Sequence, residues 1–494
     1  MRGEGDVVLR PVTDGAQRPW VILFGILIFS LLLRTDIAII DDAAQADDAA
    51  QNLEYGFMLG TTGRFAAESG ELTMYREPLP VAMTALQVRF DPRLREVTLD
   101  AIREGGPAAR ALKQQNLLWG ALLLVGVALQ VWRLASRHRG PLAVAGVLTV
   151  HLVLVEAVSH RNLSELPAAA FLVWAGILAS AIVAAGPRVT PRAILVRGSA
   201  LGAALALAAL TKASLMAIGV TYLVVLALLV LLRERRESPR ILLGLLVALL
   251  SASLLVGPWM FRNAAEFGAF SIADRGGLSL WYRAIYEDAT PREIRASWYA
   301  FAPPPAQPVV GALLGVSQEE IDAELPRVHR DSLDGDHDAP SFYQLARRDR
   351  SDLVVEFIES GLPPQQARVR ADQQLFERSV EVLRRDPQLF VRTAPLALWR
   401  GMWPVPRAPL VALPVLAVIS VAGMAALLLT GVLSALARKP RLFAIVGLPF
   451  GLVLFSALFT LFWPRFSQPA LPTMIVLLAV AADRIRSRFF SRFD

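Results

Sequence analysis

The chain has 494 residues, of which 54% are hydrophobic, and it contains no cysteine. Its apolar residues form long blocks, and its length exceeds that of one soluble hydrophobic core, so a single soluble domain is excluded. Without cysteine the chain has no disulfide, no thiolate nucleophile and no cysteine-ligated metal. Fifty Lys and Arg against 43 Asp and Glu give a net charge of +7, and this small excess does not indicate nucleic-acid binding.

The apolar blocks predict about ten membrane-spanning helices, because one crossing needs about 20 apolar residues. Their expected limits are 20–34, 116–134, 141–158, 166–186, 197–212, 215–232, 241–258, 408–436, 442–462 and 469–484. The long apolar stretch around Lys212 has to divide into two helices for this count to hold. The expected fold class is therefore an all-α, polytopic membrane protein.

Basic residues gather in alternate loops between these helices. Arginine recurs in the segments 133–139, 188–192, 233–240, 438–441 and 484–492. Because cytoplasmic loops accumulate Lys and Arg, both termini are expected in the cytoplasm. Two long segments, residues 35–115 and 259–407, then lie on the outer side, and we expect the function there.

This organisation predicts three parts. Residues 1–284 form a transmembrane module that includes the first outer segment, and residues 285–405 form an outer domain. Residues 406–494 return to the membrane and end in a basic cytoplasmic tail.

The outer domain is expected to be mostly helical, because apolar residues recur at helical spacing between proline-rich joints. One apolar face is formed by Leu375, Phe376, Val380 and Leu383. We expect this face to pack down onto the transmembrane helices.

The first outer segment contains an amphipathic stretch that is rich in acids. Ala46, Ala49, Leu53 and Phe57 recur at helical spacing with polar side chains opposite them, as in a helix lying flat in the membrane interface. Asp42, followed three residues later by a glutamine, fits the N-terminal cap of that helix. One carboxylate can cap a helix and also take part in catalysis.

The stretch DDAAQADDAAQNLEYG resembles the segment after the first helix of the type C glycosyltransferases, which span the membrane many times and use lipid-phosphate sugars. The resemblance is to family 39 in particular, with the protein O-mannosyltransferases and the lipid A aminoarabinose transferases. In this register Asp42 takes the position of the family's acid, while Ala46 stands where the family has an aromatic residue. Asp41, Asp47 and Asp48 are therefore kept as alternatives.

Further motifs of the same family follow in the same order along the chain. They are Tyr75-Arg76-Glu77-Pro78, the segment from Asn162 to Glu165, Pro258-Trp259-Met260-Phe261-Arg262-Asn263, and Pro464-Arg465-Phe466. All of them lie at the predicted outer side of the membrane. The resemblance implies that they surround the substrate site.

The resemblance implies an inverting glycosyltransferase that moves a sugar from a polyprenyl-phosphate donor to an acceptor hydroxyl at the outer face of a bacterial inner membrane. The acceptor can be a lipid, a cell-wall glycan or a protein. The competing hypothesis is a polytopic lipid or sugar transporter or flippase. Such a protein would have inverted repeats and interrupted helices in corresponding halves, and the sequence has neither.

This reaction needs a carboxylate that accepts the acceptor's proton and arginines that stabilise the departing phosphate. Asp42 is the candidate base, and Arg76 and Arg262 are candidates at the phosphate. Arg262 can equally extend towards lipid headgroups from the end of its helix. The expected substrate-binding residues are Arg76, Glu77, Glu165, Arg262, Asn263 and Arg465.

No metal is expected to be required. The acidic stretch from Asp331 to Asp338 has carboxylates at alternate positions, which could hold Ca²⁺ or Mg²⁺. It does not fit an EF-hand, because Leu345 stands at the twelfth position counted from Asp334. A solvated acidic loop is the favoured interpretation, and a divalent cation stays an open alternative.

Overall fold

The computed structural model describes residues 41–490, with gaps, and five positions of the first apolar block. The gaps are residues 95, 136–137, 156–157, 162, 186–188, 234–237, 326, 329–339, 404–412 and 461–463. Most of the predicted first span, Asn162 and the acidic stretch 331–338 lie outside the described residues.

Eight described helices are long and apolar enough to cross a membrane. They are Pro107–Leu134, Glu165–Val183, Pro191–Thr211, Ser214–Arg233, Ser238–Phe267, Ile419–Leu436, Pro440–Phe459 and Arg465–Ser487. A shorter apolar helix, Arg139–Val155, lies in the region of the predicted span 141–158. The all-α, multi-pass fold class is therefore confirmed, and an isolated bridge between Ala66 and Leu72 is the nearest approach to a strand among the described residues.

The predicted division at Lys212 is confirmed. Helix α11 (Pro191–Thr211) ends just before Lys212, and α12 (Ser214–Arg233) begins two residues after it. The backbone of Lys212 is extended, which interrupts the helical hydrogen bonds at this point.

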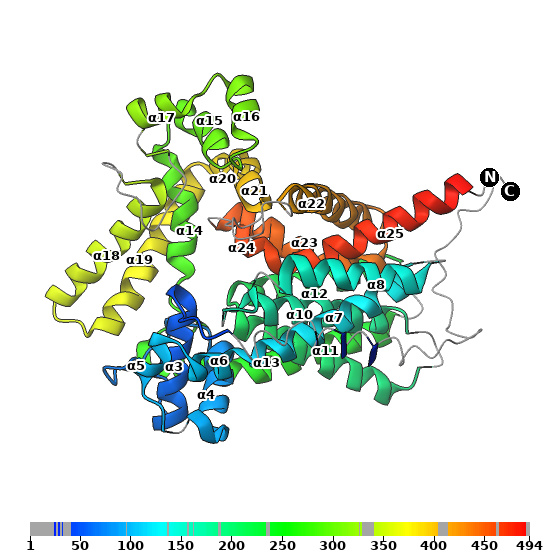
Figure 1. The fold of residues 1–494 in the computed structure, drawn as a ribbon, viewed down its shortest axis with the longest axis horizontal. Helices are drawn as coiled ribbons and strands as arrows, with labels where there is room; N and C mark the ends of the chain where they lie inside the picture. The colour runs from blue at the N-terminus through cyan, green and yellow to red at the C-terminus, as the bar shows by residue number, and fades with distance from the viewer. Residues whose placement is uncertain are drawn as a thin grey trace.

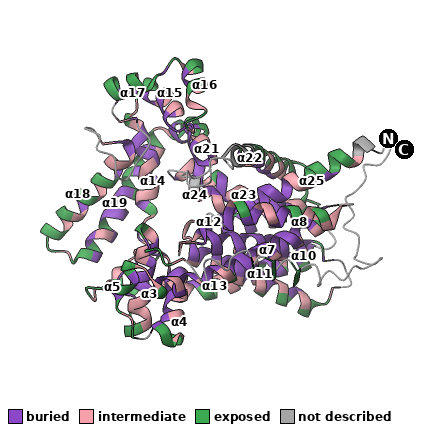
Figure 2. Cartoon of the chain, viewed as in Figure 1, coloured by how far each residue is buried: buried purple, intermediate pink, exposed green. Residues whose placement is uncertain are grey.

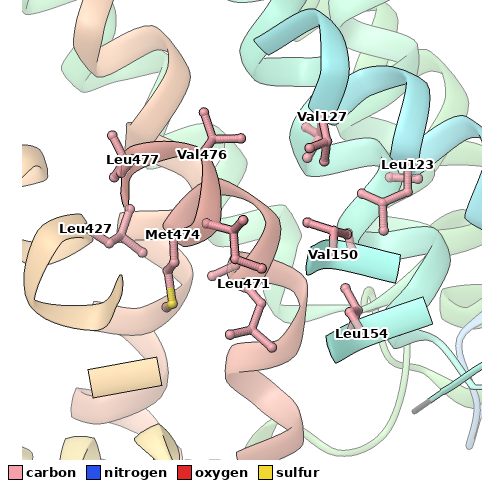
Figure 3. Close-up of a cluster of buried hydrophobic side chains, with 14 of the residues drawn as sticks. Leu123, Val127, Val150, Leu154, Leu427, Leu471, Met474, Val476 and Leu477 are labelled. Carbon is pink, nitrogen blue, oxygen red and sulfur yellow. The ribbon is translucent and has the colours of Figure 1, made fainter. Parts of the chain in front are cut away.

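The centre of the bundle is filled by aliphatic side chains from helices distant in sequence (Figure 3). Leu123 of α7 (Gln115–Leu134) and Val150 of α8 (Arg139–Val150) belong to the same buried cluster as Leu427 of α22 (Leu413–Leu436) and Met474 of α25 (Leu471–Phe490). Inside a bilayer such helices associate through close van der Waals packing, since lipid tails are as apolar as leucine. Helices from early and late parts of the described chain are therefore packed into one transmembrane unit.

Glycines allow α11 to approach α13 (Ser238–Phe267) closely. A Cβ atom on Gly202 would lie 2.4 Å from the carbonyl oxygen of Ala248, and one on Gly198 would lie 2.6 Å from that of Gly244. The two α11 glycines are four residues apart and share one helix face, as in the small-xxx-small pattern of membrane helix pairs.

The outer faces of the bundle carry large apolar side chains (Figure 2). Leu250 and Leu254 of α13 are 60% and 76% exposed, and Leu228 of α12 is 53% exposed. In water such faces would be costly, whereas lipid chains solvate them. These surfaces are the lipid-facing sides of a membrane protein.

Both long outer segments lie at the same end of the bundle (Figure 1). The first contains α3 (Asp47–Thr62), α4 (Pro78–Phe90), α5 (Leu99–Glu104) and α6 (Pro107–Lys113). The second contains α14 (Gly276–Ala284), α15 (Pro291–Ala300), α16 (Gln307–Leu314), α17 (Gln318–Glu324), α18 (Phe342–Glu359), α19 (Pro364–Arg385), α20 (Pro387–Arg392) and α21 (Ala394–Met402). The mostly helical outer domain is thus confirmed.

The expected N-terminal cap at Asp42 is wrong. Helix α3 begins at Asp47, and Ala46 precedes it without a side-chain cap. Residues 41–46 have no helical structure, because their carbonyls are bound elsewhere: the Gly106 N–H donates to Asp42 O (2.7 Å) and Lys113 Nζ donates to Ala43 O (2.6 Å).

The prediction for the apolar face of α19 is wrong at Phe376 and in its packing partner, because the face packs mainly on helices of the outer domain and not on the transmembrane helices. Phe376 is 51% exposed, while its neighbour Leu375 is fully buried against Leu353 of α18. Val380 and Leu383 pack on the apolar cluster of the outer domain. The face is divided because α19 has α18 and α14 as neighbours on different sides.

We predict that Gly202→Ala destabilises the protein, because the added methyl would overlap the Ala248 carbonyl and force α11 away from α13. A loss of about 1–3 kcal/mol is expected for such overpacking, measured as a lower thermal unfolding temperature in detergent. Gly140→Ala is the matched control, since no atom lies within 4 Å of a Cβ built there. Equal unfolding temperatures for the two variants would contradict the close packing.

Candidate functional site

Asp48, in the first turn of α3, is surrounded by three arginines. Its Oδ1 lies 2.7 Å from Arg76 Nη1 and 3.7 Å from Arg275 Nη1, and its Oδ2 lies 2.5 Å from Arg465 Nη2. Arg76 is almost completely buried and also donates through Nε to Asn52 Oδ1 at 3.0 Å. Side chains from residues more than 400 positions apart in sequence therefore meet at one carboxylate.

A second ion pair adjoins this group. Lys212 Nζ lies 3.7 Å from Glu165 Oε1, and both side chains are largely buried. Lys212 also lies 4.4 Å from the centre of the Phe466 ring, next to Arg465 in sequence. Glu77 is close enough to Lys212 and Arg275 for electrostatic attraction.

We call this set the basic cluster. It consists of Asp48, Arg76, Glu77, Glu165, Lys212, Arg275 and Arg465. It contains four cationic side chains and three carboxylates, so a positive charge remains for an anionic ligand.

Every member of the basic cluster stands at or beside the start of a helix. Asp48 and Arg465 are second residues of α3 and α24 (Pro464–Ser467), Glu165 is the first residue of α10 (Glu165–Val183), and Arg275 directly precedes α14. Arg76 and Glu77 precede α4, and Lys212 precedes α12. Helix N-termini carry partial positive charge, so their convergence favours an anion.

The sequence explains why these helices begin here. Pro78 and Pro464 occupy first helical positions, where a proline costs no hydrogen bond. In Figure 1 the starts of α3, α14 and α24 lie at the end of the transmembrane bundle that the two outer segments cover. The basic cluster therefore lies between the bundle and the outer helices.

The charge of Asp48 is fixed by its surroundings. Burial alone would raise the pKa of this carboxyl, but Arg76, Arg465 and Arg275 outweigh burial and hold the pKa far below its usual range. Asp48 is thus a permanent carboxylate among these guanidinium groups. It acts as a resident counter-ion for guanidinium groups that would otherwise repel one another.

Tyr75 connects the basic cluster to the outer domain. Its ring centre lies 4.0 Å from the Arg275 guanidinium carbon and 5.6 Å from that of Arg350 in α18. Burial would raise the pKa of the Tyr75 hydroxyl, but Arg275 and Arg350 lower it below its ordinary value. Tyr75 therefore contacts both Arg275 of the basic cluster and Arg350 of the outer domain.

Two buried carboxylates hold the segment around Arg275. Asp372 of α19 accepts the N–H groups of Gly277 and Leu278, both at 2.9 Å. Asp274 lies 3.5 Å from Arg350 Nη2 and accepts a hydrogen bond from Gln365 Nε2 at 3.1 Å. These contacts tie the start of α14 to the hairpin formed by α18 and α19.

Asp274 is held in a poorly solvated position. Its Oδ1 is buried without a hydrogen-bond partner among the residues that the structure describes. Burial raises the pKa of Asp274 to about 6, against the attraction of Arg350. The carboxyl is therefore partly protonated near pH 6.

Asp41 and Asp42 are held at α6 and the loop before α10. Asp41 accepts Lys113 Nζ (2.8 Å) and lies 2.7 Å from His160 Nδ1. Burial would raise the pKa of Asp41, but Lys113 and His160 lower it. Asp42 is 47% exposed and lies 3.2 Å from Arg110 Nε. Their contacts are thus with α6 and not with the arginines around Asp48.

Asp47 differs from its neighbour Asp48. Its side chain is exposed and its backbone has a φ of 53°, in the left-handed region at the start of α3. The turn at Asp47 directs the chain into α3, so that Asp48 rather than Asp47 reaches the arginines.

Arg262 and Asn263 bind the first outer segment to the end of α13. Arg262 Nη1 donates to Thr73 O at 2.9 Å, and its guanidinium lies 4.9 Å and 5.0 Å from the rings of Trp259 and Phe267. Asn263 is fully buried and donates to Ser271 O at 2.7 Å. The structure therefore gives both residues packing partners outside the basic cluster.

The sequence motifs included Arg76, Glu77, Glu165 and Arg465, which the structure brings together. They omitted Arg275 and Lys212 as site residues, and Lys212 was used only to mark the division between two spans. The signal for both was present, because each precedes a helix start: Lys212 stands between two apolar spans, and Arg275 precedes a Gly-Gly pair.

No group of three His, Asp or Glu that could hold a metal ion occurs in the part of the chain that the structure describes. The acidic stretch 331–338 is outside that part.

Two solved membrane transferases are similar in structure to this chain. ArnT from Cupriavidus metallidurans, solved with undecaprenyl phosphate, is 14% identical, with 93% of this chain and 78% of ArnT covered at a TM-score of 0.39. The oligosaccharyltransferase AglB from Archaeoglobus fulgidus, in complex with an inhibitory peptide and a dolichol-phosphate, is 13% identical, with 97% of this chain covered at a TM-score of 0.48. The chain spans about half of AglB, 52%. No protein-family model and no curated protein sequence matches the chain.

We predict that stability falls as the pH rises through the titration of Asp274. The folded state binds the proton of the Asp274 carboxyl more tightly than the unfolded chain does, since the pKa of this carboxyl is near 3.8 in the unfolded chain. The free energy of unfolding therefore decreases as the pH rises from about 4 to about 6. The loss is at most about 3 kcal/mol. Thermal unfolding of wild type and Asp274→Asn across this range measures it, and parallel profiles for the two proteins would contradict the assignment.

Proposed function

We propose that this protein is an inverting glycosyltransferase that moves a sugar from a polyprenyl-phosphate donor to an acceptor hydroxyl. The observation that carries the proposal is the basic cluster: converging helix N-termini and four cationic side chains around Asp48, at the end of a membrane bundle. Such a site suits a phosphate whose lipid remains in the bilayer. The family resemblance of the motifs that contain these residues supports the same function.

The donor phosphate would bind to Arg76, Arg275, Arg465 and Lys212. Guanidinium groups present N–H donors in a planar fork that matches phosphate oxygens. Asp48 accepts one hydrogen bond from each of two guanidinium groups, from Arg76 at Oδ1 and from Arg465 at Oδ2. A phosphate would share the same donors, so Asp48 keeps them oriented before the donor arrives.

In the reaction the bond between the anomeric carbon and the phosphate oxygen breaks, and its electron pair remains on that oxygen. Arg76, Arg275 and Arg465 stabilise the negative charge that develops there. The acceptor oxygen attacks from the opposite side, which inverts the configuration, and its proton passes to a carboxylate. The products are the glycosylated acceptor and polyprenyl phosphate.

Asp48 is the carboxylate that we favour as the base. The phosphate competes for the guanidinium groups that depress the pKa of Asp48, so donor binding raises its basicity when a base is needed. Asp42, the candidate from the sequence motif, stays an alternative, with Arg110 as its neighbour.

The acceptor is a lipid, a cell-wall glycan or a protein hydroxyl. We further propose that the protein belongs to a bacterial inner membrane, with both termini in the cytoplasm and the basic cluster on the outer face. The arginine-rich alternate loops support this orientation. No cofactor is assigned.

We predict that Asp48→Asn lowers turnover by about 10²–10⁴-fold, the usual contribution of a general base. Asp42→Asn is the matched control, because the same substitution six residues away changes an exposed carboxylate beside Arg110. Purified proteins are incubated with a panel of polyprenyl-phosphate sugars and acceptors, and released polyprenyl phosphate is measured by mass spectrometry. Loss of activity in Asp42→Asn with retention in Asp48→Asn would restore the assignment from the sequence motif.

We also predict that Arg275→Gln weakens binding of undecaprenyl phosphate by about 10- to 100-fold, since a hydrogen bond to a charged group contributes about 1.5–3 kcal/mol. Binding is measured as the ligand-induced rise in unfolding temperature. The matched control is Arg262→Gln, which removes an arginine that contacts Thr73 and aromatic rings. It should lower the unfolding temperature without changing the ligand-induced shift, and equal weakening in both variants would contradict the proposed phosphate site.

A further inference from the structure

Helix α16 belongs to an unusually apolar part of the outer domain. Residues 296–318 contain no charged side chain, although the segment lies outside the transmembrane helices. Within α16, Val309 is 63% exposed and Leu313 is 79% exposed, the largest exposure of any bulky apolar side chain that the structure describes. Water is a poor solvent for such a surface.

The two exposed side chains share one face of α16. Val309 and Leu313 are four residues apart, so they lie one helical turn apart on the same side. Gly311 is on the inner side, where a Cβ atom would lie 2.6 Å from Val316 O and 3.1 Å from the Tyr299 ring. Helix α16 is therefore fixed to α15 by its small inner residue and presents an apolar outer face.

The neighbours of α16 lead directly to the membrane. Helix α15 packs on α21 through Trp298 and Trp399, whose ring centres are 5.8 Å apart. The Nε1–H group of Trp399 also donates to the backbone oxygen of Trp298 at 2.8 Å. Trp403 follows at 4.5 Å from Trp399, and the chain then continues to the membrane helix α22. Tryptophans of this kind are typical of the membrane–water boundary.

The arrangement in space agrees with this connection. In Figure 1, α17, α15 and α16 lie in a row from left to right, and the transmembrane bundle extends to the right. Helix α16 is therefore on the bundle side of α15, and α17 is on the other side. Of the helices α15, α16 and α17, α16 is thus the one nearest to the bundle in this direction.

We propose that α16 lies in the outer interfacial layer of the bilayer, with Val309 and Leu313 among the lipid chains. A lipid surface fits this helix better than a protein partner does. A protein interface normally has a polar rim around its apolar centre, and residues 296–318 contain no charged side chain that could form such a rim. The contact gives the outer domain a second attachment to the membrane besides its covalent links. This inference does not depend on the proposed transferase activity.

The absence of cysteine from the chain allows a direct test, since one introduced cysteine is the only labelling site. Leu313→Cys is labelled with an environment-sensitive fluorophore, and the full-length protein is reconstituted into phosphatidylglycerol–phosphatidylethanolamine vesicles. Quenching by lipids with a nitroxide on the acyl chain is compared with quenching by aqueous iodide. Leu254→Cys on the lipid-facing side of α13 and Glu319→Cys on exposed α17 are the matched controls.

The label at 313 should lose fluorescence to the lipid quencher to an extent similar to the label at 254, and should be less accessible to iodide than the label at 319. A label at 313 that behaves like the label at 319 would overturn the proposal. Protection from both quenchers that disappears on dilution of the protein in lipid would overturn it in favour of a second copy of the chain. Since Leu313 is exposed, unchanged thermal unfolding of the labelled protein verifies that the fold is intact.

Discussion

The attraction between Asp48 and three guanidinium groups is the interaction on which the arrangement of the outer helices depends. Arg76, Arg275 and Arg465 come from separate parts of the chain, and all three approach one carboxylate, Arg76 and Arg275 at Oδ1 and Arg465 at Oδ2. A buried arginine without a partner would be very costly, so removing the carboxylate would unbalance several elements together. This concentration of charge is the feature on which the proposed binding of a phosphate rests.

The bilayer explains why the charges gather in one place. Along the transmembrane helices, polar groups have no water to bind, and the interior is filled with aliphatic side chains and close glycine contacts. Helix ends at the boundary are different, because their N–H groups need partners and their dipoles favour anions. A site formed from helix starts therefore satisfies the backbone N–H groups and also suits the phosphate that we propose as its ligand.

The membrane helices could be predicted from the sequence because each leaves a local signal, a long apolar block bounded by polar residues. The division at Lys212 followed from length alone. The assembly of the site could not be predicted in the same way, since whether Asp42, Asp47 or Asp48 meets the arginines depends on where α3 begins. That start is set by Gly106 and Lys113, more than 50 residues later, which hold residues 42 and 43 out of the helix. Arg262 shows the same limit: a motif gave its position, but its aromatic partners Trp259 and Phe267 decide what it contacts.

The contact between α14 and α19 has a consequence for motion. At Gly277 a Cβ atom would lie 1.8 Å from Asp372 O, and the Asp372 carboxylate binds the first N–H groups of α14. Two helices that meet this closely move as one rigid body, and Arg275 at the start of α14 moves with them. If the hairpin α18–α19 tilted towards an acceptor, the guanidinium of Arg275 would therefore be displaced with it. The outer surface is in this way mechanically linked to the charge beside Asp48.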